Sequence, residues 1–211
     1  MPTYAFSDVV TSIDQLREII GTPGDLAVRK QISTIDRHCH RFIERSPFVL
    51  VSSANATGTC DVSPRGDSPG FVHVLGDKTL LIPERPGNRR ADTLTNIIEN
   101  PRVGLLFLIP NVEETLRING FACLIRDPDL LAQMAFKGKV PVLAIAVEAE
   151  EVFFHCAKAF RRSHLWQPEH WPDRSELPTL GQILVDQTRL EDTTAEVLDC
   201  SIEEAYQTRL Y

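Results

Sequence analysis

The chain has 211 residues, of which 43% are hydrophobic and 24% are charged, a balance typical of a globular protein with a sizeable core. Its formal net charge of −7 disfavours nucleic acid and anionic membranes as partners, so any anion site has to be local. The five cysteines are scattered and form no CxxC pair, which favours reduced thiols in a cytoplasmic protein and gives little support for a metal site. We expect no signal peptide and no membrane span.

Two helices are expected in residues 1–47, ahead of the first strand. Ser12 is a candidate N-cap for the first helix, and Gly21 ends it. The second helix is expected to follow Asp25 and to keep apolar residues at helical spacing until it stops before Pro47. We interpret this part of the chain as a helical N-terminal extension.

Short strands with short connections dominate residues 48–155. The expected strands are 48–54, 59–64, two within 71–83 around a Gly76-Asp77 turn, 103–109, 115–125 and 141–155. Helices are expected at 89–100 and near 128–136. Because few crossover helices join the strands, the pattern predicts a mainly β (α+β) fold, an antiparallel barrel with peripheral helices.

Residues 156–211 are less regular and are interpreted as a C-terminal helical segment. Two final helices are expected at 178–187 and 201–210, the second with Ser201 as its N-cap. No linker divides the chain clearly. We therefore interpret residues 1–211 as a single domain with its core at 48–155.

Arg89 and Arg90 lie at the start of the helix predicted for 89–100, with Asn88 as its N-cap. Cations in a first turn oppose the helix dipole by up to about 1 kcal/mol. That cost disappears if an anion binds there, because a phosphate accepts hydrogen bonds from the free helix N–H groups and from the guanidinium groups together. A basic surface cluster that includes Arg85 explains the same residues equally well.

Three motifs, and their order along the chain, resemble the pyridoxamine 5′-phosphate oxidase family, the FMN-binding split barrels. NRRADTLTNIIENPRVGLLFLIP (88–110) resembles the flavin-phosphate loop of that family, and ETLRINGFA (114–122) is similar to its next strand. DVSPRGD (61–67) is similar to an earlier strand that lies beside the cofactor. The resemblance runs from about Phe48 to Val147. It implies a split β-barrel, FMN as the cofactor, and a homodimer with each flavin between two subunits.

The resemblance also implies which side chains surround the flavin. Those expected to hold the phosphate or line the ribityl chain are Pro83, Asn88, Arg89 and Arg90. Those expected along the flavin edge are Ser63, Arg65 and Asp67, and Thr115 is expected to reach the partner subunit's flavin. Asn88 and Arg90 replace the serine and lysine of the family's triplet, and both keep the hydrogen-bond donors that an anion needs.

The tract HCAKAFRRSHLW (155–166) resembles a branch of FMN-dependent enzymes without an assigned substrate, so pyridoxamine oxidation is not transferred to this chain. Lys158 and Arg161 would share a helix face and, with Ser163, could hold an acidic group of a substrate or of the partner subunit's flavin. Trp166 could stack on an aromatic ring. The alternative is a solvated basic helix anchored by a buried tryptophan.

The sequence therefore predicts an FMN-dependent oxidoreductase that acts on an unidentified small molecule, with the flavin supplying the redox step. No catalytic acid or base is assigned. The alternative is a non-catalytic carrier or sensor of flavin, and deazaflavin or haem, which other split barrels use, stay open as cofactors. We expect a two-fold homodimer with equivalent sites.

Overall fold

The computed structural model describes residues 6–190 and 192–211. The chain divides into two compact units, of which the first ends at Gln31 and the second spans Ile32–Tyr211. The first unit contains α1 (Ile13–Ile20) and α2 (Asp25–Arg29). The expected cap of α1 is confirmed, since Ser12 Oγ accepts the Gln15 N–H at 3.1 Å. Within the described part of this unit, neither helix buries a side chain.

The single helix predicted after Asp25 is wrong, because the structure has two shorter helices there. The second of them, α3 (Arg37–Arg45), begins after Asp36, whose carboxylate accepts the N–H groups of His38 and Cys39 at 2.9 Å each. Ile32 lies between the helices and exchanges two backbone hydrogen bonds with Val152, at 3.0 and 2.8 Å. This pairing holds the backbone out of the helical conformation, and Asp36 then starts a new helix.

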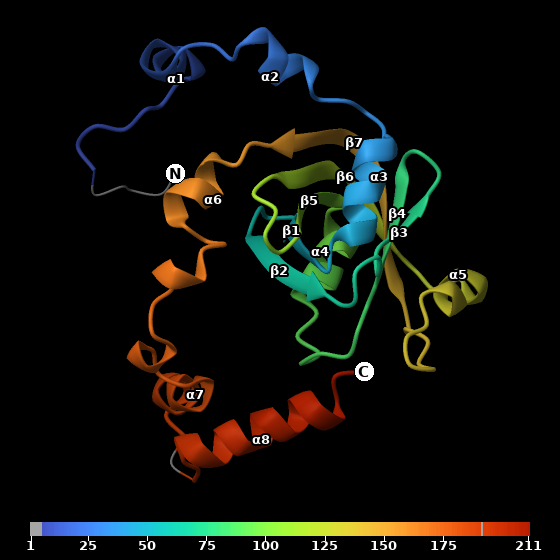
Figure 1. Ribbon diagram of the computed structural model, residues 1–211, viewed down its shortest axis with the longest axis vertical. Coiled ribbons are helices and arrows are strands. Elements are labelled where there is room, and N and C mark those ends of the chain that lie inside the picture. Colours follow the sequence, from blue (N-terminus) through green and yellow to red (C-terminus); the bar gives the residue numbers. More distant parts are fainter. Residues whose placement is uncertain (1–5, 191) are drawn as a thin grey trace. The chain divides into compact units, whose positions relative to one another are not determined.

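Seven strands form one antiparallel sheet in the order β2-β1-β5-β6-β7-β4-β3 (Figure 1). The strands are β1 (Phe48–Ala54), β2 (Cys60–Gly66), β3 (His73–Leu75), β4 (Thr79–Pro83), β5 (Arg102–Leu108), β6 (Thr115–Ile125) and β7 (Ala144–His155). The predicted class, a mainly β split barrel with peripheral helices, is confirmed. The sheet is not closed among the described residues, and β2, which contains Pro64, is one of its edges.

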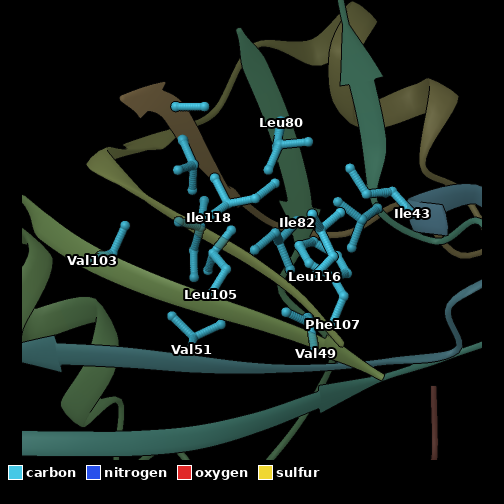
Figure 2. Packing of buried hydrophobic residues seen from close by; sticks show 14 of the residues in the cluster. Ile43, Val49, Val51, Leu80, Ile82, Val103, Leu105, Phe107, Leu116 and Ile118 are labelled. Carbon is cyan, nitrogen blue, oxygen red and sulfur yellow. The ribbon is translucent and has the colours of Figure 1, made fainter. Parts of the chain in front are cut away.

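The core lies on one face of this sheet. Burial alternates along β1 and β5, because successive side chains of a strand point to opposite faces. Figure 2 shows how the inward residues of the strands meet one another and Ile43 of α3. The labelled members are Ile43, Val49, Val51, Leu80, Ile82, Val103, Leu105, Phe107, Leu116 and Ile118.

A bulge between Asn119 and Gly120 shifts the register of β6 against β7. At Gly120 a Cβ atom would lie 1.9 Å from the main-chain oxygen of Glu148. Only glycine therefore fits the two strands at this separation.

The helix after the arginine pair begins later than predicted. The structure has α4 (Asp92–Glu99), with Ala91 at the N-cap position and no side-chain cap. Asn88 is therefore not the N-cap; its Oδ1 instead accepts the Arg90 N–H at 3.0 Å. Ala91 has a left-handed backbone, φ 60°, which prevents the helix from extending back to Arg89.

The remaining helices lie after β6. They are α5 (Pro128–Gln133), α6 (Lys158–Ser163), two short 3₁₀ turns (Pro168–His170 and Arg174–Glu176), α7 (Leu180–Thr188) and α8 (Ala195–Thr208). The prediction of Ser201 as the N-cap of the last helix is wrong. Helix α8 already begins after Thr194, whose hydroxyl oxygen accepts a hydrogen bond from the Val197 N–H at 3.4 Å. Of the helices in the described residues, none is long and apolar enough to cross a membrane.

Helices α7 and α8 pack together at Gly181. Its N–H donates to Asp199 Oδ1 at 2.7 Å, and a Cβ atom there would lie 2.3 Å from the main-chain oxygen of Ala195. In this described part of the chain, Gly181 is the buried residue of α7, and α8 has none. The contact between the helices thus depends on a residue without a side chain.

Candidate functional site

The arginine pair lies in the loop between β4 and α4. Arg89 and Ala91 both have left-handed backbone, with φ values of 62° and 60°. This conformation is unfavourable for residues other than glycine, and such strain gathers at binding loops whose shape the surrounding structure enforces. The loop is therefore a specific arrangement and not a loose connection.

Both guanidinium groups of the pair are exposed. Arg90 pairs with Asp92 in the first turn of α4, and this hydrogen bond raises the pKa of Arg90 above its ordinary value. The Arg90 side chain nevertheless stays 77% exposed. An anion at the start of α4 can therefore reach both arginines and the free N–H groups of the first turn.

A set of polar side chains fastens the start of α4 to the sheet. The Asp61 carboxylate of β2 accepts hydrogen bonds from the hydroxyl groups of Ser63, at 3.1 Å, and Thr93, at 2.8 Å. One turn further on, Asn96 Nδ2 donates to Ser53 Oγ of β1 at 3.0 Å in a buried position. Ser63, predicted as a flavin-edge residue, thus lies close to the helix that follows the arginine pair. The sequence did not single out Asp61 or Thr93. The one available signal was the two-residue spacing of Asp61 and Ser63, which places both side chains on the same face of a strand.

Two ion pairs join the end of β2 to the end of β4. Arg85 Nε donates to Asp67 Oδ2 at 2.7 Å, and Arg65 Nη2 lies 3.4 Å from Glu84 Oε2. The structure thus brings Arg65 and Asp67 next to acidic and basic partners that sequence reasoning did not identify. Pro83 lies just before these partners, buried at the end of β4.

The pair of Arg65 and Glu84 is incompletely satisfied. Among the described residues, Arg65 Nε and Glu84 Oε2 are buried and have no hydrogen-bond partner. Burial raises the pKa of Glu84, and this effect outweighs the opposing influence of the Arg65 charge. Buried polar atoms without partners cost free energy, which indicates that a further polar group completes this corner.

Arg161 and Trp166, two of the residues predicted around α6, line a cavity of about 520 Å³. Arg161 Nε donates to Glu113 Oε2 at 2.7 Å, and Trp166 Nε1 donates to the main-chain oxygen of Val112 at 2.9 Å. The Trp166 ring stacks on Phe160 with 5.6 Å between centroids. The lining residues are Asn111, Val112, Glu113, Glu114, Phe160, Arg161, Trp166 and Gln167.

Three other predicted site residues are not part of the cavity wall. Lys158 and Ser163 are exposed on α6, and the Ser163 hydroxyl donates to the Phe160 main-chain oxygen at 3.2 Å. Thr115 is buried at the start of β6, opposite His155 of β7. The cavity has the volume of small-molecule sites, and its charge comes from Arg161 and from the carboxylates of Glu113 and Glu114.

Residues 6–190 and 192–211 contain no group of three or more His, Cys, Asp or Glu side chains placed to hold an ion. Cys39, which lies in the RHCHR tract, is buried, and burial raises the pKa of its thiol to about 12.

Comparison with known proteins gives a family and a set of similar folds. The family model described as pyridoxamine 5′-phosphate oxidase matches residues 35–156, more than half of the chain. No curated protein matches the chain. Among solved structures, HupZ from Group A Streptococcus is similar with a TM-score of 0.48 and 18% identity, over 57% of this chain and 93% of that one.

Two further solved structures show similar values. A candidate pyridoxamine 5′-phosphate oxidase from Lactobacillus delbrueckii has a TM-score of 0.46 and 20% identity, over 58% of this chain and 95% of that one. The general stress protein 26 of Bacillus anthracis has a TM-score of 0.44 and 15% identity, over 54% of this chain and 88% of that one. On the match of the family model to residues 35–156, the chain belongs to the pyridoxamine 5′-phosphate oxidase family.

Proposed function

We propose that the protein binds FMN and is an oxidoreductase that acts on a small molecule. The observation that carries this proposal is the loop before α4, where two exposed arginines and left-handed non-glycine residues precede a helix N-terminus. Membership of the pyridoxamine 5′-phosphate oxidase family supports a flavin as the ligand.

The donors present in the loop fit the phosphate of FMN. Arg89 and Arg90 offer planar forks of N–H groups, which match phosphate oxygens, and the first turn of α4 adds backbone N–H groups. Asp92 is the present partner of Arg90, and a dianion would compete with it for the same guanidinium. Asn88 orients the loop through its hydrogen bond to the Arg90 N–H.

The incompletely satisfied pair at the end of β2 fits the flavin edge. When bound, FMN supplies the chemistry of accepting and releasing a hydride. Arg65 has a buried N–H without a partner among the described residues, so it has a donor available for a polar ring atom. Its positive charge would stabilise negative charge on a reduced cofactor, and Glu84 holds the guanidinium in place.

The cavity beside α6 is the proposed place for the small-molecule substrate. Arg161 already pairs with Glu113, so a substrate acid would share or displace that carboxylate. The stacked Phe160 and Trp166 rings supply a flat apolar wall. These features favour a small molecule with a planar part and a charged group. Lys158 and Ser163, which are exposed on α6, belong to the proposal only as peripheral contacts.

We also propose a two-fold homodimer that covers the second face of the sheet and places Thr115 near the partner's flavin. Leu50, Leu106, Arg117 and Phe153 lie next to one another across four strands of this face, and all are only half-buried. Within the described residues, Arg117 Nε is buried and has no hydrogen-bond partner. A second copy would cover the apolar side chains of this row and supply an acceptor to Arg117.

The first test changes both loop arginines. In Arg89→Ala plus Arg90→Ala, we expect FMN affinity to fall at least about a hundredfold, because each charge-assisted bond is worth about 1.5–3 kcal/mol. Titration of the purified protein with FMN, followed by flavin fluorescence, measures this. Retention of the original affinity would overturn the assignment of the loop.

A control with the same loss of charge is Arg29→Ala plus Arg41→Ala, since both side chains are exposed and lie outside the loop. This variant should bind FMN as the unchanged protein does. If both double variants lose FMN equally, the effect is one of net charge and the loop is not the site. Far-UV circular dichroism of both variants checks that the fold survives.

The second test separates an enzyme from a carrier. The FMN-loaded protein is reduced without oxygen by a nicotinamide donor and then mixed with electron acceptors. Repeated turnover supports an oxidoreductase, whereas a flavin that stays oxidised or is reduced only once supports a carrier or sensor.

The homodimer is tested by sedimentation velocity at micromolar concentration. The unchanged protein should sediment as a dimer, and Leu106→Arg should sediment as a monomer because it replaces an apolar side chain of this face by a second cation next to Arg117. An unchanged protein that is monomeric with FMN bound would contradict the dimer.

A further inference from the structure

Tyr211 contacts residues far away in the sequence. Its hydroxyl donates to Asp67 Oδ1 at 2.9 Å, and its ring centroid lies 4.7 Å from that of Phe136. The cations of Arg85 and Lys137 lie 6.0 and 5.1 Å from the centre of the ring. Three kinds of recognition thus meet at one side chain: a hydrogen bond to the hydroxyl, a ring contact and nearby cations.

The acceptor of this hydrogen bond is a fixed, buried carboxylate. The Asp67 side chain is 1% exposed, and its Oδ2 accepts Arg85 Nε at 2.7 Å. Its Oδ1 accepts both the Ser68 N–H, at 2.7 Å, and the Tyr211 hydroxyl. Because the hydrogen bond from Arg85 orients Asp67, the carboxylate presents a defined acceptor to a hydroxyl donor.

A cavity of about 230 Å³ adjoins the same residues. Asp67, Arg85 and Phe136 line it and also contact Tyr211. The rest of its wall comes from Ser68, Pro69, Gly70, Phe71, His73, Gln133, Met134 and Ala135. This wall combines apolar side chains, such as Phe71 and Met134, with polar ones, such as His73 and Gln133.

Apart from the packing of α8 on α7, few described contacts hold this part of the chain. Helix α8, which precedes Tyr211, has no buried residue among those described, and Tyr206 and Leu210 are both 55% exposed. Lys139 Nζ donates to the main-chain oxygen of Tyr211. The ring of Tyr211 is thus a principal contact between this segment and the residues next to the sheet.

We propose that Asp67, Arg85 and Phe136 form a binding site for a phenol, that Tyr211 of the same chain is its resident occupant, and that a small para-substituted phenol binds there when Tyr211 is absent. The carboxylate selects the hydroxyl, and Phe136 with the two cations selects the ring. Tyr211 keeps other phenols out because it is tethered beside the site. This inference does not depend on the binding of FMN.

The test removes Tyr211 and supplies its side chain as a free molecule. p-Cresol is the tyrosine side chain itself, and it should bind to Tyr211→Ala and not measurably to the unchanged protein. The chemical shifts of backbone amides near Asp67 and Phe136, followed during titration, report binding at this site. The matched control is Tyr206→Ala, which removes an exposed tyrosine of α8 and should behave as the unchanged protein does.

Two further probes test the role of Asp67 without changing it. Toluene lacks the hydroxyl, and 4-methylanisole keeps the oxygen but cannot donate a hydrogen bond. Both should bind Tyr211→Ala at least about tenfold more weakly than p-cresol does. The proposal is overturned if p-cresol does not bind Tyr211→Ala, if it binds Tyr206→Ala equally well, or if all three probes bind alike.

Discussion

The strands β5 and β6 and the helices α7 and α8 are stabilised in different ways. In the strands, Phe107, Leu116 and Ile118 are completely buried in the core on one face of the sheet. In the helices, the described residues bury only Gly181, while Leu180 and Val197 stay exposed. The strands therefore depend on packing against distant parts of the chain. The helices depend on their caps and on each other.

The difference explains which elements a sequence reveals. A strand with one buried face needs apolar residues at every second position, so its burial is visible as a pattern. An exposed helix has no such requirement, and its ends depend on single capping residues. The comparison predicts that equal substitutions will have unequal effects in the two regions.

The largest difference is expected for leucines. Leu116→Ala should lower the free energy of unfolding by about 3 kcal/mol, because it removes a completely buried side chain and leaves a cavity. Leu177→Ala, at a position that is 59% exposed ahead of α7, should change it by less than about 0.5 kcal/mol. Urea unfolding followed by circular dichroism measures both. Equal losses would show that the segment before α7 packs as tightly as the sheet.

A slightly smaller effect is expected at the bulge of β6. Gly120→Ala should lower the free energy of unfolding by about 2 kcal/mol, because the new Cβ meets the Glu148 main chain and the two strands must separate. Gly87→Ala is the matched control, since a Cβ there meets no atom within 4 Å. The same urea experiment applies. A Gly120→Ala protein as stable as the control would mean that the strands can part at no cost.

The contact between α7 and α8 should be weakened without damage to the sheet. Gly181→Ala places a Cβ against the Ala195 main chain and removes the close approach of the helices, at a cost of about 1.5 kcal/mol to this pair. Hydrogen exchange should become about tenfold faster in α7 and α8 and stay unchanged in β5 and β6. Gln182→Ala, at an exposed neighbour, is the control. Faster exchange throughout the sheet would contradict the separation of the two regions.

The smallest effect concerns the cap of α3. Asp36→Ala should cost about 1 kcal/mol at neutral pH, because two backbone N–H groups lose their acceptor. The hydrogen bond from the Cys39 N–H holds the pKa of Asp36 below its ordinary value of 3.8. A lowered pKa means that the stabilisation is complete above pH 3.8 and is lost as the pH falls through the folded-state value.

Unfolding of Asp36→Ala and of the original protein at pH 6 and at pH 3 measures this dependence. The difference between the two proteins should be smaller at the lower pH. Asp36→Asn keeps an acceptor without a titrating group, so it should retain most of the stability at both values. A difference that grows on acidification would refute the cap.

The sheet could be predicted nearly to the residue. The strand expected at 115–125 is β6 itself, and those around the Gly76-Asp77 turn are β3 and β4. The errors fall where tertiary contacts or single backbone angles decide the outcome. The pairing of Ile32 with Val152 interrupts a helical pattern, and the left-handed Ala91 delays α4. No local sequence pattern predicts either the strand pairing or the left-handed backbone.

For the candidate site, the sequence suggested individual residues but not the pairs that they form. The family resemblance pointed to Arg65, Asp67 and Arg161. It did not show that Glu84, Arg85 and Glu113 are their partners, because a sequence pattern records local spacing and not which distant side chains meet. Tyr211, which contacts Asp67 across 144 positions, lies outside the region that the resemblance covers.

The open edge at β2 has a consequence for the protein in concentrated solution. An edge strand has unpaired N–H and C=O groups, and identical strands from other molecules can pair with them, which is a route to fibrils. Pro64 interrupts this edge because proline has no amide hydrogen to offer an incoming strand. Pro64, which is exposed and contributes little to the core, thus disfavours self-association through the edge of the sheet.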